Sequence, residues 1–391
     1  MSFIAKIKKP LSVCFVITNL DCGGAEAMLL RLLSQLDRNR FTVQVVSLVE
    51  IGPMGKKIQA LGIPVRALGM HPGKPSLNAL LQLVRWLRQD QPDLIQTWMY
   101  HADLMGGIAA RLAGGGVPLV WGIRQSDLGP EGNGRFTVLT VKACAWLSRW
   151  MPDRIVCCSE ASRQVHTALG YSADKMIMIP NGYDVTVFRP NSAASELVRK
   201  ELQIPGGASV IGMVARFHPQ KDHYNFIQAA GLLHKKSPDV YFVLCGYGVD
   251  WENRQLSRWI EETGIREQVY LLGQRDDIPH LTAALDIASL SSSYGEGFPN
   301  VVSEAMSCEV PCVVTDVGDA ALIVGQTGMV VAPRNPATLA EAWQTMLDLG
   351  REGRMRLGIA ARQRIKEEFD LPKIVARYEK FFEDLAHTSP R

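Results

Sequence analysis

The sequence of 391 residues lacks the features that mark several specialised protein classes. Its 42 basic and 39 acidic side chains leave a net charge of +3, which is too small to indicate a nucleic-acid-binding protein. No apolar run reaches about 18 residues, so no transmembrane helix is expected. Apolar residues make up 47% of the chain and charged residues 21%, which indicates a globular protein rather than a disordered, collagen-like or coiled-coil chain.

The eight cysteines include no Cys-x-x-Cys pair with the spacing of a zinc site. Several lie in apolar runs, where a thiol behaves as a small apolar group. This usage predicts a reducing cytoplasm and no disulfide framework. Residues 1–20 are basic and then apolar, but no small-residue cleavage site follows them, so we expect a first strand there rather than a signal peptide.

Short apolar runs alternate with segments of helical periodicity through most of the chain. Runs that are apolar on both faces are typical of strands in a parallel sheet covered by helices, so the fold class is α/β. Strands are expected at residues 12–18, 43–49, 94–97, 119–123, 154–158, 209–214, 240–244, 269–272, 287–290 and 311–315. Helices are expected at residues 25–36, 76–89, 103–113, 136–150, 222–235 and 370–385.

The alternation pauses between residues 181 and 196, which are rich in Pro, Asn, Ser and Ala. At about 100–200 residues per domain, the length also fits two domains. We therefore expect two Rossmann-like doubly wound domains, residues 1–185 and 186–369, followed by a helix in residues 370–391. Ligands of such sheets bind beyond the carboxyl ends of the strands, which predicts a site in a cleft between the domains.

Two glycine-containing turns follow expected strands without completing a nucleotide fingerprint. Gly23 and Gly24 precede a helix whose N-terminal amides suit an anion, although a tight turn explains them equally well. Residues 246–248 would need a third glycine at the position of Trp251 to match the dinucleotide motif. A nicotinamide cofactor is therefore not indicated, and no Gly-Lys-Ser/Thr phosphate loop is present either.

Two cations follow the first strand of the second half. Arg216 and Lys221 offer a guanidinium fork and an ammonium group at a strand end, and this combination suits a pyrophosphate. The alternative is that both are ordinary solvated surface charges.

Residues 291–306 form the most informative stretch, because a strand end, a loop with Gly and Pro, and a helix start follow one another. The helix N-terminus near Asn300 can receive phosphate oxygens. Glu304, just beyond it, can accept hydrogen bonds from ribose hydroxyls, or it is simply a charge in the first turns of the helix. Glu296 in the loop and Glu304 could also form a glycosidase pair, but the sequence does not give their separation.

In combination these motifs resemble a retaining glycosyltransferase of the GT-B fold, in glycosyltransferase family four (glycosyl transferases group one). The matching residues are Gly23 to Glu26, Pro180 to Asp184, Arg216 with Lys221, Glu296 to Asn300 with Glu304, Thr315 to Gly318, and Thr327 with Gly328. The resemblance covers nearly the whole chain and is most specific in the second half. It implies an acceptor-binding first domain, a nucleotide-sugar-binding second domain, and a C-terminal helix that crosses back onto the first.

The resemblance also implies the role of each residue. Arg216 and Lys221 would neutralise the diphosphate, Glu296 would contact the transferred sugar, and Glu304 would hold the ribose. The further donor contacts that it implies are Gly23, Gly24, Gln274, Arg275, Gly297, Phe298, Pro299, Asn300 and Val301. No enzymic nucleophile and no cofactor would be needed. The absence of an Asp-x-Asp motif agrees with a metal-independent enzyme.

The chain departs from the family pattern after the strand at 119–123, where many relatives have a histidine and this sequence has Arg124. Arg124 is therefore a candidate for a contact with the donor or the acceptor. His101 is a candidate for the acceptor side, or a locally bonded residue at a helix start. A second departure is Asp222, where a glycine commonly follows the lysine.

Cations accompany tryptophan in residues 76–89 and 136–150, and Lys6, Lys8 and Lys9 cluster at the N-terminus. Such clusters suit a peripheral membrane contact, or they belong to ordinary amphipathic helices. We expect a cytoplasmic hexosyltransferase that acts on a glycan or lipid-linked acceptor, with a UDP-sugar favoured over a GDP-sugar. A membrane contact, if the clusters make one, would be with the inner face of the cell membrane, and the amphipathic-helix interpretation is the commoner one. The pathway would be surface polysaccharide or glycolipid synthesis. The alternatives are a nucleotide-sugar epimerase of the same fold and a non-catalytic nucleotide-sugar-binding subunit.

Overall fold

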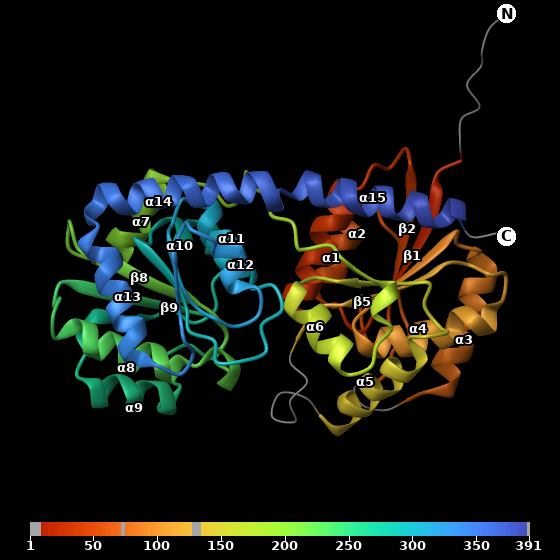
Figure 1. Ribbon diagram of the computed structural model, residues 1–391, viewed down its shortest axis with the longest axis horizontal. Helices are drawn as coiled ribbons and strands as arrows, with labels where there is room; N and C mark the ends of the chain where they lie inside the picture. Colours follow the sequence, from red (N-terminus) through yellow and green to blue (C-terminus); the bar gives the residue numbers. More distant parts are fainter. Residues whose placement is uncertain (1–8, 72–74, 127–133, 389–391) are drawn as a thin grey trace, which may run out of the picture. The chain divides into compact units, whose positions relative to one another are not determined.

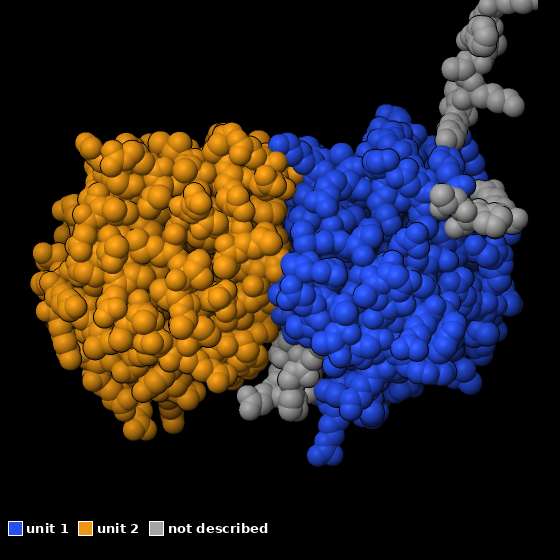
Figure 2. Space-filling view, viewed as in Figure 1, with its two compact units in different colours: residues 1–182, 371–391 blue, residues 183–370 orange. Residues whose placement is uncertain are grey.

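The computed structural model describes residues 9–71, 75–126 and 134–388. The chain divides into two compact units, coloured separately in Figure 2. Unit 1 contains residues 1–182 and 371–391, and unit 2 contains residues 183–370. The boundaries expected from the sequence were 185 and 369. Each unit is a parallel sheet with helices on both faces, so the α/β class is confirmed (Figure 1).

Unit 1 is built on a seven-stranded parallel sheet. Its strands are β1 (Leu11–Ile17), β2 (Phe41–Ser47), β3 (Val65–Ala67), β4 (Leu94–Trp98), β5 (Leu119–Ile123), β6 (Arg154–Cys157) and β7 (Met176–Met178). Its helices are α1 (Gly24–Gln35), α2 (Pro53–Ala60), α3 (Leu77–Asp90), α4 (Tyr100–Ala113), α5 (Arg135–Leu147), α6 (Glu160–Ala168), the 3-10 turn η1 (Ala173–Lys175) and α15 (Leu371–Thr388). The strand order is β3-β2-β1-β4-β5-β6-β7.

Two hydrophobic clusters cover the faces of this sheet. One joins α1, α2 and α15 to the strands, and the other joins α3, α4 and α5. Phe382 of α15 lies edge-on to Phe15 of β1 and to Phe41 of β2, with ring centroids 6.0 and 6.3 Å apart. Aromatic pairs of this geometry stabilise the folded state by more than the burial of their apolar area alone. The last helix of the chain is therefore part of the core of unit 1.

Unit 2 is built on a six-stranded parallel sheet. Its strands are β8 (Ser209–Val214), β9 (Val240–Cys245), β10 (Val269–Leu271), β11 (Ile287–Leu290), β12 (Cys312–Thr315) and β13 (Met329–Val331). Its helices are α7 (Ser192–Glu201), η2 (Pro219–Lys221), α8 (His223–His234), α9 (Arg254–Thr263), η3 (Arg266–Gln268), α10 (Ile278–Ala283), α11 (Asn300–Ser307), α12 (Ala320–Val324), α13 (Pro336–Asp348), α14 (Gly350–Arg364) and the π-helical turn η4 (Ile365–Phe369). The strand order is β10-β9-β8-β11-β12-β13.

The core of unit 2 centres on an aromatic group. Trp343 of α13 lies 4.9 Å from Phe226 of α8 and 6.0 Å from Phe242 of β9, measured between ring centroids.

The strands expected from the sequence are present, with ends shifted by at most two residues. Three strands of three residues each, β3, β7 and β13, were not expected, and α7 begins inside the segment interpreted as a pause.

Candidate functional site

The functional residues predicted in the second half gather at one edge of the unit 2 sheet. All of its strands are parallel, so their carboxyl ends meet at the same edge. Arg216 follows β8, residues 246–248 follow β9, residues 291–300 follow β11, and Gly318 follows β12. This edge is where ligands of open parallel sheets bind.

The turn that carries Lys221 is fixed by two neighbouring segments. Asp222 adopts the left-handed conformation (φ 47°) and accepts a hydrogen bond from the amide of Asn225, which caps α8. The hydroxyl of Ser291 donates to the carbonyl oxygen of Lys221 at 2.8 Å, and the amide of Ser293 donates to that of Gln220 at 2.9 Å. The loop after β11 therefore holds the backbone of Lys221 in place.

Lys221 forms an ion pair with Glu296 inside this edge. Nζ of Lys221 lies 2.5 Å from Oε1 of Glu296, and the hydroxyl of Ser292 donates to the same carboxylate oxygen at 2.5 Å. The side chains of Lys221 and Glu296 are only 18% and 7% exposed, respectively. A pair this shielded from water is much stronger electrostatically than a surface pair, and removing one partner leaves an uncompensated charge.

The loop around Glu296 is packed closely against the turn after β12. A Cβ atom at Gly318, which has φ +63°, would lie 2.2 Å from the carbonyl oxygen of Glu296. The amide of Asp319 donates to the carbonyl oxygen of Gly297 at 2.9 Å. Glycine at position 318 is therefore required both by the backbone conformation and by the close approach.

Helix α11 begins immediately after this loop. Pro299 precedes it, and the hydroxyl of the fully buried Tyr183 donates to Oδ1 of Asn300 at 2.6 Å. The ring of Tyr183 also stacks against that of Phe298, with centroids 6.2 Å apart. Glu304, one turn further along α11, is buried. Tyr183, which comes from a separate segment of the chain, thus holds both the loop before α11 and the first residue of that helix.

Arg216 differs from Lys221 because it is exposed and forms no ion pair with any residue that the structure describes. The neighbouring loop is close to its backbone, since a Cβ atom at Gly246 would lie 2.1 Å from the carbonyl oxygen of Ala215. His223 is buried nearby, and burial, with a smaller effect of Lys221, lowers the pKa of its imidazole to about 4. The His223 ring is therefore neutral at pH 7, and the positive charge here comes from Lys221 and Arg216.

Gln274 and Arg275 follow β10 at the same edge. Gln274 is exposed, whereas the guanidinium of Arg275 is bonded to Asp277 and Glu201, with closest N–O distances of 2.7 and 2.6 Å. These hydrogen bonds raise the pKa of Arg275 and lower that of Asp277. The Arg275 side chain is thus engaged, and the predicted contact of a base with the backbone of Gln274 and Arg275 stays a prediction.

Gly23 and Gly24 lie in unit 1, at the N-terminus of α1. A Cβ atom at Gly23 would lie 2.3 Å from Oε2 of Glu26, so a side chain there would require the carboxylate of this first-turn glutamate to move. The predicted contact of the two glycines with a ligand stays a prediction.

Arg124, at the end of β5, is held within unit 1. Its guanidinium carbon lies 3.5 Å from the centroid of the Trp98 ring. Its Nη2 donates to the hydroxyl of Tyr378 at 2.5 Å, and its Nη1 donates to Oδ1 of Asn181 at 3.4 Å. The predicted contact of Arg124 with donor or acceptor would have to compete with these interactions, which attach α15 to the sheet.

The end of β4 carries two further titratable groups. Met99 has φ 77° and ψ 155°, a backbone region populated almost only by glycine, and it immediately precedes α4. His101 is partly buried, which lowers its pKa. Asp103 is fully buried and accepts hydrogen bonds from the hydroxyl of Thr97 and the amide of Gly122. Burial raises the pKa of Asp103 to about 7.

Two family models divide the chain between them. The model described as Glycosyltransferase Family 4 matches residues 22–187, and that described as Glycosyl transferases group 1 matches residues 194–364. The chain belongs to glycosyltransferase family 4.

Relatives with known names support this family. The glycosyltransferase is 26% identical over 302 residues to the UDP-Gal:alpha-D-GlcNAc-diphosphoundecaprenol alpha-1,3-galactosyltransferase of Escherichia coli, covering 75% of this chain and 76% of the relative. It is 24% identical over 315 residues to the putative glycosyltransferase EpsF of Bacillus subtilis, covering 78% and 79%.

Solved structures establish the fold. Anabaena HepE in complex with UDP superposes with a TM-score of 0.84 at 24% identity, over 96% of this chain and 100% of HepE. A glycosyltransferase of Rickettsia africae gives a TM-score of 0.84 at 16% identity, over 98% and 100%. The predicted GT-B fold is confirmed.

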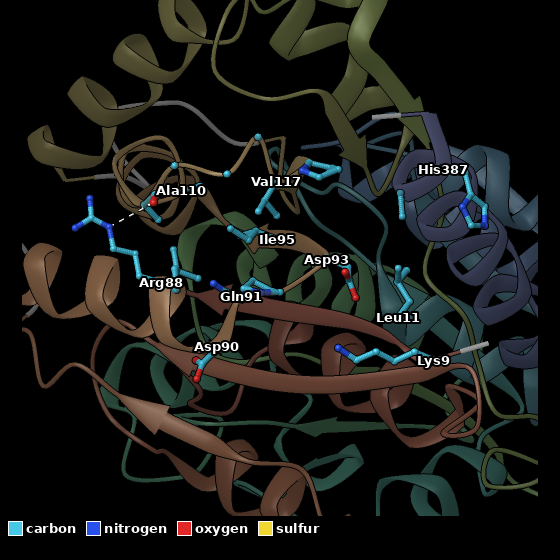
Figure 3. A pocket seen from close by; sticks show the side chains of 18 of the residues that line it. Lys9, Leu11, Arg88, Asp90, Gln91, Asp93, Ile95, Ala110, Val117 and His387 are labelled. Atoms are coloured by element: carbon cyan, nitrogen blue, oxygen red, sulfur yellow. Dashed lines mark hydrogen bonds between the residues drawn. The ribbon is translucent and has the colours of Figure 1, made fainter. Parts of the chain in front are cut away.

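The glycosyltransferase also contains a cavity of about 950 Å³ at the opposite, amino-terminal edge of the unit 1 sheet (Figure 3). Its lining includes Lys9, Leu11, Arg88, Asp93 and His387, and none of the site residues predicted from the sequence. Lys9 thus lies at this cavity, whereas Lys6 and Lys8 are outside the described residues.

Residues 9–71, 75–126 and 134–388 of the glycosyltransferase contain no group of three or more His, Cys, Asp or Glu side chains that could hold a metal ion. In the same ranges, no helix has the length and apolar character needed to cross a bilayer.

Three residues that position the site were given no role by the sequence analysis. They are Tyr183, which holds Asn300; Ser292, which holds Glu296; and Thr315, whose hydroxyl donates to the carbonyl oxygen of Ser292 at 2.6 Å. Tyr183 and Thr315 belong to motifs that carried the resemblance, and this was the available signal. Nothing in the sequence distinguished Ser292 from the serines beside it.

Proposed function

We propose that this glycosyltransferase moves a sugar from a UDP-sugar to a hydroxyl of a glycan or lipid-linked acceptor, in surface polysaccharide or glycolipid synthesis. The observation that carries the proposal is the shielded Lys221–Glu296 pair beside the exposed Arg216. The choice of UDP is supported by HepE, which was solved with UDP and with UDP-glucose, and by the UDP-Gal in the name of the E. coli galactosyltransferase. That name also supports a lipid diphosphate acceptor.

The donor would bind along the carboxyl edge of unit 2. Arg216 and Lys221 would neutralise the diphosphate, because two cations in the segment that follows β8 can each take a phosphate oxygen. The buried carboxylate of Glu304 would accept hydrogen bonds from the ribose hydroxyls. The other proposed contacts are the base with the backbone of Gln274 and Arg275, the sugar and phosphate with Gly297 to Val301, and the diphosphate with Gly23 and Gly24.

The transfer would retain the anomeric configuration without an enzymic nucleophile. The acceptor oxygen bonds to the anomeric carbon on the face from which the diphosphate leaves, and the electron pair of the breaking bond stays on the phosphate oxygen. That oxygen takes the proton of the acceptor hydroxyl. Arg216, Lys221 and the N-terminal amides of α11 would stabilise the charge that develops on the diphosphate. Glu296, held by Ser292, would accept hydrogen bonds from sugar hydroxyls. No step needs a metal ion, and we include metal independence in the proposal.

The donor is testable by thermal unfolding with a panel of nucleotides and nucleotide sugars. We expect UDP and one UDP-sugar to raise the melting temperature, since a ligand at 100 times its dissociation constant stabilises by about 2.7 kcal/mol. GDP at the same concentration should have a much smaller effect. Stabilisation by GDP and not by UDP would contradict the donor assignment.

The chemistry is tested by incubation of the stabilising donor with acceptors in the presence of EDTA. We expect transfer to continue, and NMR coupling constants of the product to show the anomeric configuration of the donor. An inverted product would contradict the mechanism. Rearrangement of the donor sugar with no acceptor present would instead indicate an epimerase.

A further inference from the structure

Helix α5 of unit 1 presents an exposed apolar stripe. Phe136, Leu139, Trp146 and Trp150 lie on or just after it, and each is between 60% and 66% exposed. The rings of Trp146 and Trp150 meet edge to face, with centroids 5.1 Å apart. Their helical spacing places all four side chains on one side of the helix.

The opposite side of α5 packs into the hydrophobic core of unit 1. Val141, Cys144 and Ala145 are buried and belong to the hydrophobic cluster that α5 shares with α3 and α4. Figure 1 shows α5 at the margin of unit 1, next to α4 and α6. The apolar stripe is therefore not needed for packing within unit 1.

Cations run along one side of this stripe. Arg135, Lys142 and Arg149 are exposed and recur every two helical turns. None of them forms an ion pair within the part of the chain that the structure describes. Indole rings next to unpaired cations match the two layers of a bilayer interface, where acyl chains lie beneath anionic headgroups.

Helix α3 was the other candidate from the sequence, and its side chains are used differently. The guanidinium of Arg66 lies 4.6 Å from the centroid of the Trp86 ring, which covers that indole. Arg88 donates to the carbonyl oxygens of Leu112 and Ala113. On α3 the tryptophan and one of its cations are thus engaged within unit 1, whereas those of α5 are not.

We propose that the outer face of α5 docks onto an anionic lipid bilayer, with Phe136, Leu139, Trp146 and Trp150 entering the interface and Arg135, Lys142 and Arg149 contacting headgroup phosphates. The contact deepens the proposed function, because it would bring the enzyme to a lipid-linked acceptor. Binding to lipid does not itself depend on the identity of the donor.

The test is flotation of the full-length protein with vesicles of phosphatidylcholine, with and without phosphatidylglycerol. We expect binding to vesicles with phosphatidylglycerol, weakening as salt rises. The double variant K142E/R149E should bind at least about 25-fold more weakly, at about fivefold for each cation removed. W146S/W150S should bind at least about tenfold more weakly even at low salt, because the apolar anchors are lost.

The matched control is L77S/R85E on α3, which changes an exposed leucine and an exposed cation on the rival helix. It should bind like the unmodified protein. Failure of that protein to bind either vesicle, or equal losses for the α3 and α5 variants, would overturn the proposal. Stabilisation by UDP, measured on every variant, separates this result from a failure of the proposed donor and also verifies that each variant folds.

Discussion

The two units use one strand order for different purposes. Counted from the first strand of each unit, both sheets run 3-2-1-4-5-6, and unit 1 adds β7 at the end. In unit 2 the segment after its first strand supplies Lys221, which pairs with Glu296 from the segment after its fourth. In unit 1 the cation after the fifth strand, Arg124, binds Tyr378 of the last helix. The scaffold is common, and the side chains at the strand ends decide whether a cation pairs with a carboxylate at the candidate site or packs against a helix.

Among substitutions that test this difference between the units, the largest expected effect on activity is at Lys221. Lys221→Ala should lower the rate of transfer about 100- to 1,000-fold, because it removes a preorganised charge from the leaving diphosphate. The initial rate with a saturating UDP-sugar is the measurement, and Lys236→Ala, at an exposed lysine of the same unit, is the control. Near-normal transfer by Lys221→Ala, with an unchanged melting temperature, would remove Lys221 from the mechanism.

The buried carboxylates of the two units give the second prediction. Glu296 has a lysine partner, whereas Asp103 has hydrogen-bond donors and only a weaker electrostatic interaction with Arg124, and burial raises the pKa of Asp103 to about 7. The folded protein therefore binds more protons at Asp103 than the unfolded chain between about pH 4 and pH 7, so this group makes stability fall as pH rises through that window. Above about pH 7 this contribution of Asp103 to the free energy of unfolding is fully lost.

Asp103→Asn should remove this dependence. Relative to the unmodified protein, the free energy of unfolding of the variant should rise between pH 4 and pH 7, by on the order of a few kcal/mol, and then level off. Denaturant unfolding at several pH values measures it. Parallel stability curves for the two proteins would show that Asp103 is ionised in the folded state throughout.

The smallest expected effect is at Arg124. Arg124→Met should lower the free energy of unfolding by about 1.5–3 kcal/mol, because it removes charged hydrogen bonds and leaves the hydroxyl of the buried Tyr378 without this donor. UDP affinity should stay within about twofold. Titration calorimetry measures the UDP affinity of the variant, and thermal unfolding measures its stability. A tenfold loss of UDP affinity at unchanged stability would indicate that Arg124 contacts the donor.

Much of this could be predicted from the sequence, because parallel strands and their helices have strong local patterns. The strands that were identified include the three-residue β10, whereas β3, β7 and β13 were not identified, since three residues show little periodicity. Helix α7 was hidden because the segment before it is rich in residues typical of loops. These short elements depend on pairing with neighbouring strands rather than on their own sequence.

The site divides in the same way. Arg216, Lys221, Glu296 and Glu304 were chosen as candidate site residues by residue type and motif, which are local properties. The contacts that such side chains make were not predicted, because the Lys221–Glu296 pair spans 75 residues and the Arg124–Tyr378 hydrogen bond spans 254. Such contacts follow from how strands and helices assemble, and that assembly is where a sequence without structure is least informative.

Helix α15 has a consequence for the order in which the protein is made. Domains usually fold as units while the ribosome is still at work, the N-terminal one first. Here the unit that begins the chain takes Ile374, Tyr378 and Phe382 of its core from the final 21 residues, 371–391. Unit 2, which ends at residue 370, is synthesised completely before unit 1 receives its last helix. During translation unit 1 therefore cannot complete its core until unit 2 has been synthesised. Until then Phe382 does not yet cover the apolar surface of Phe15 and Phe41.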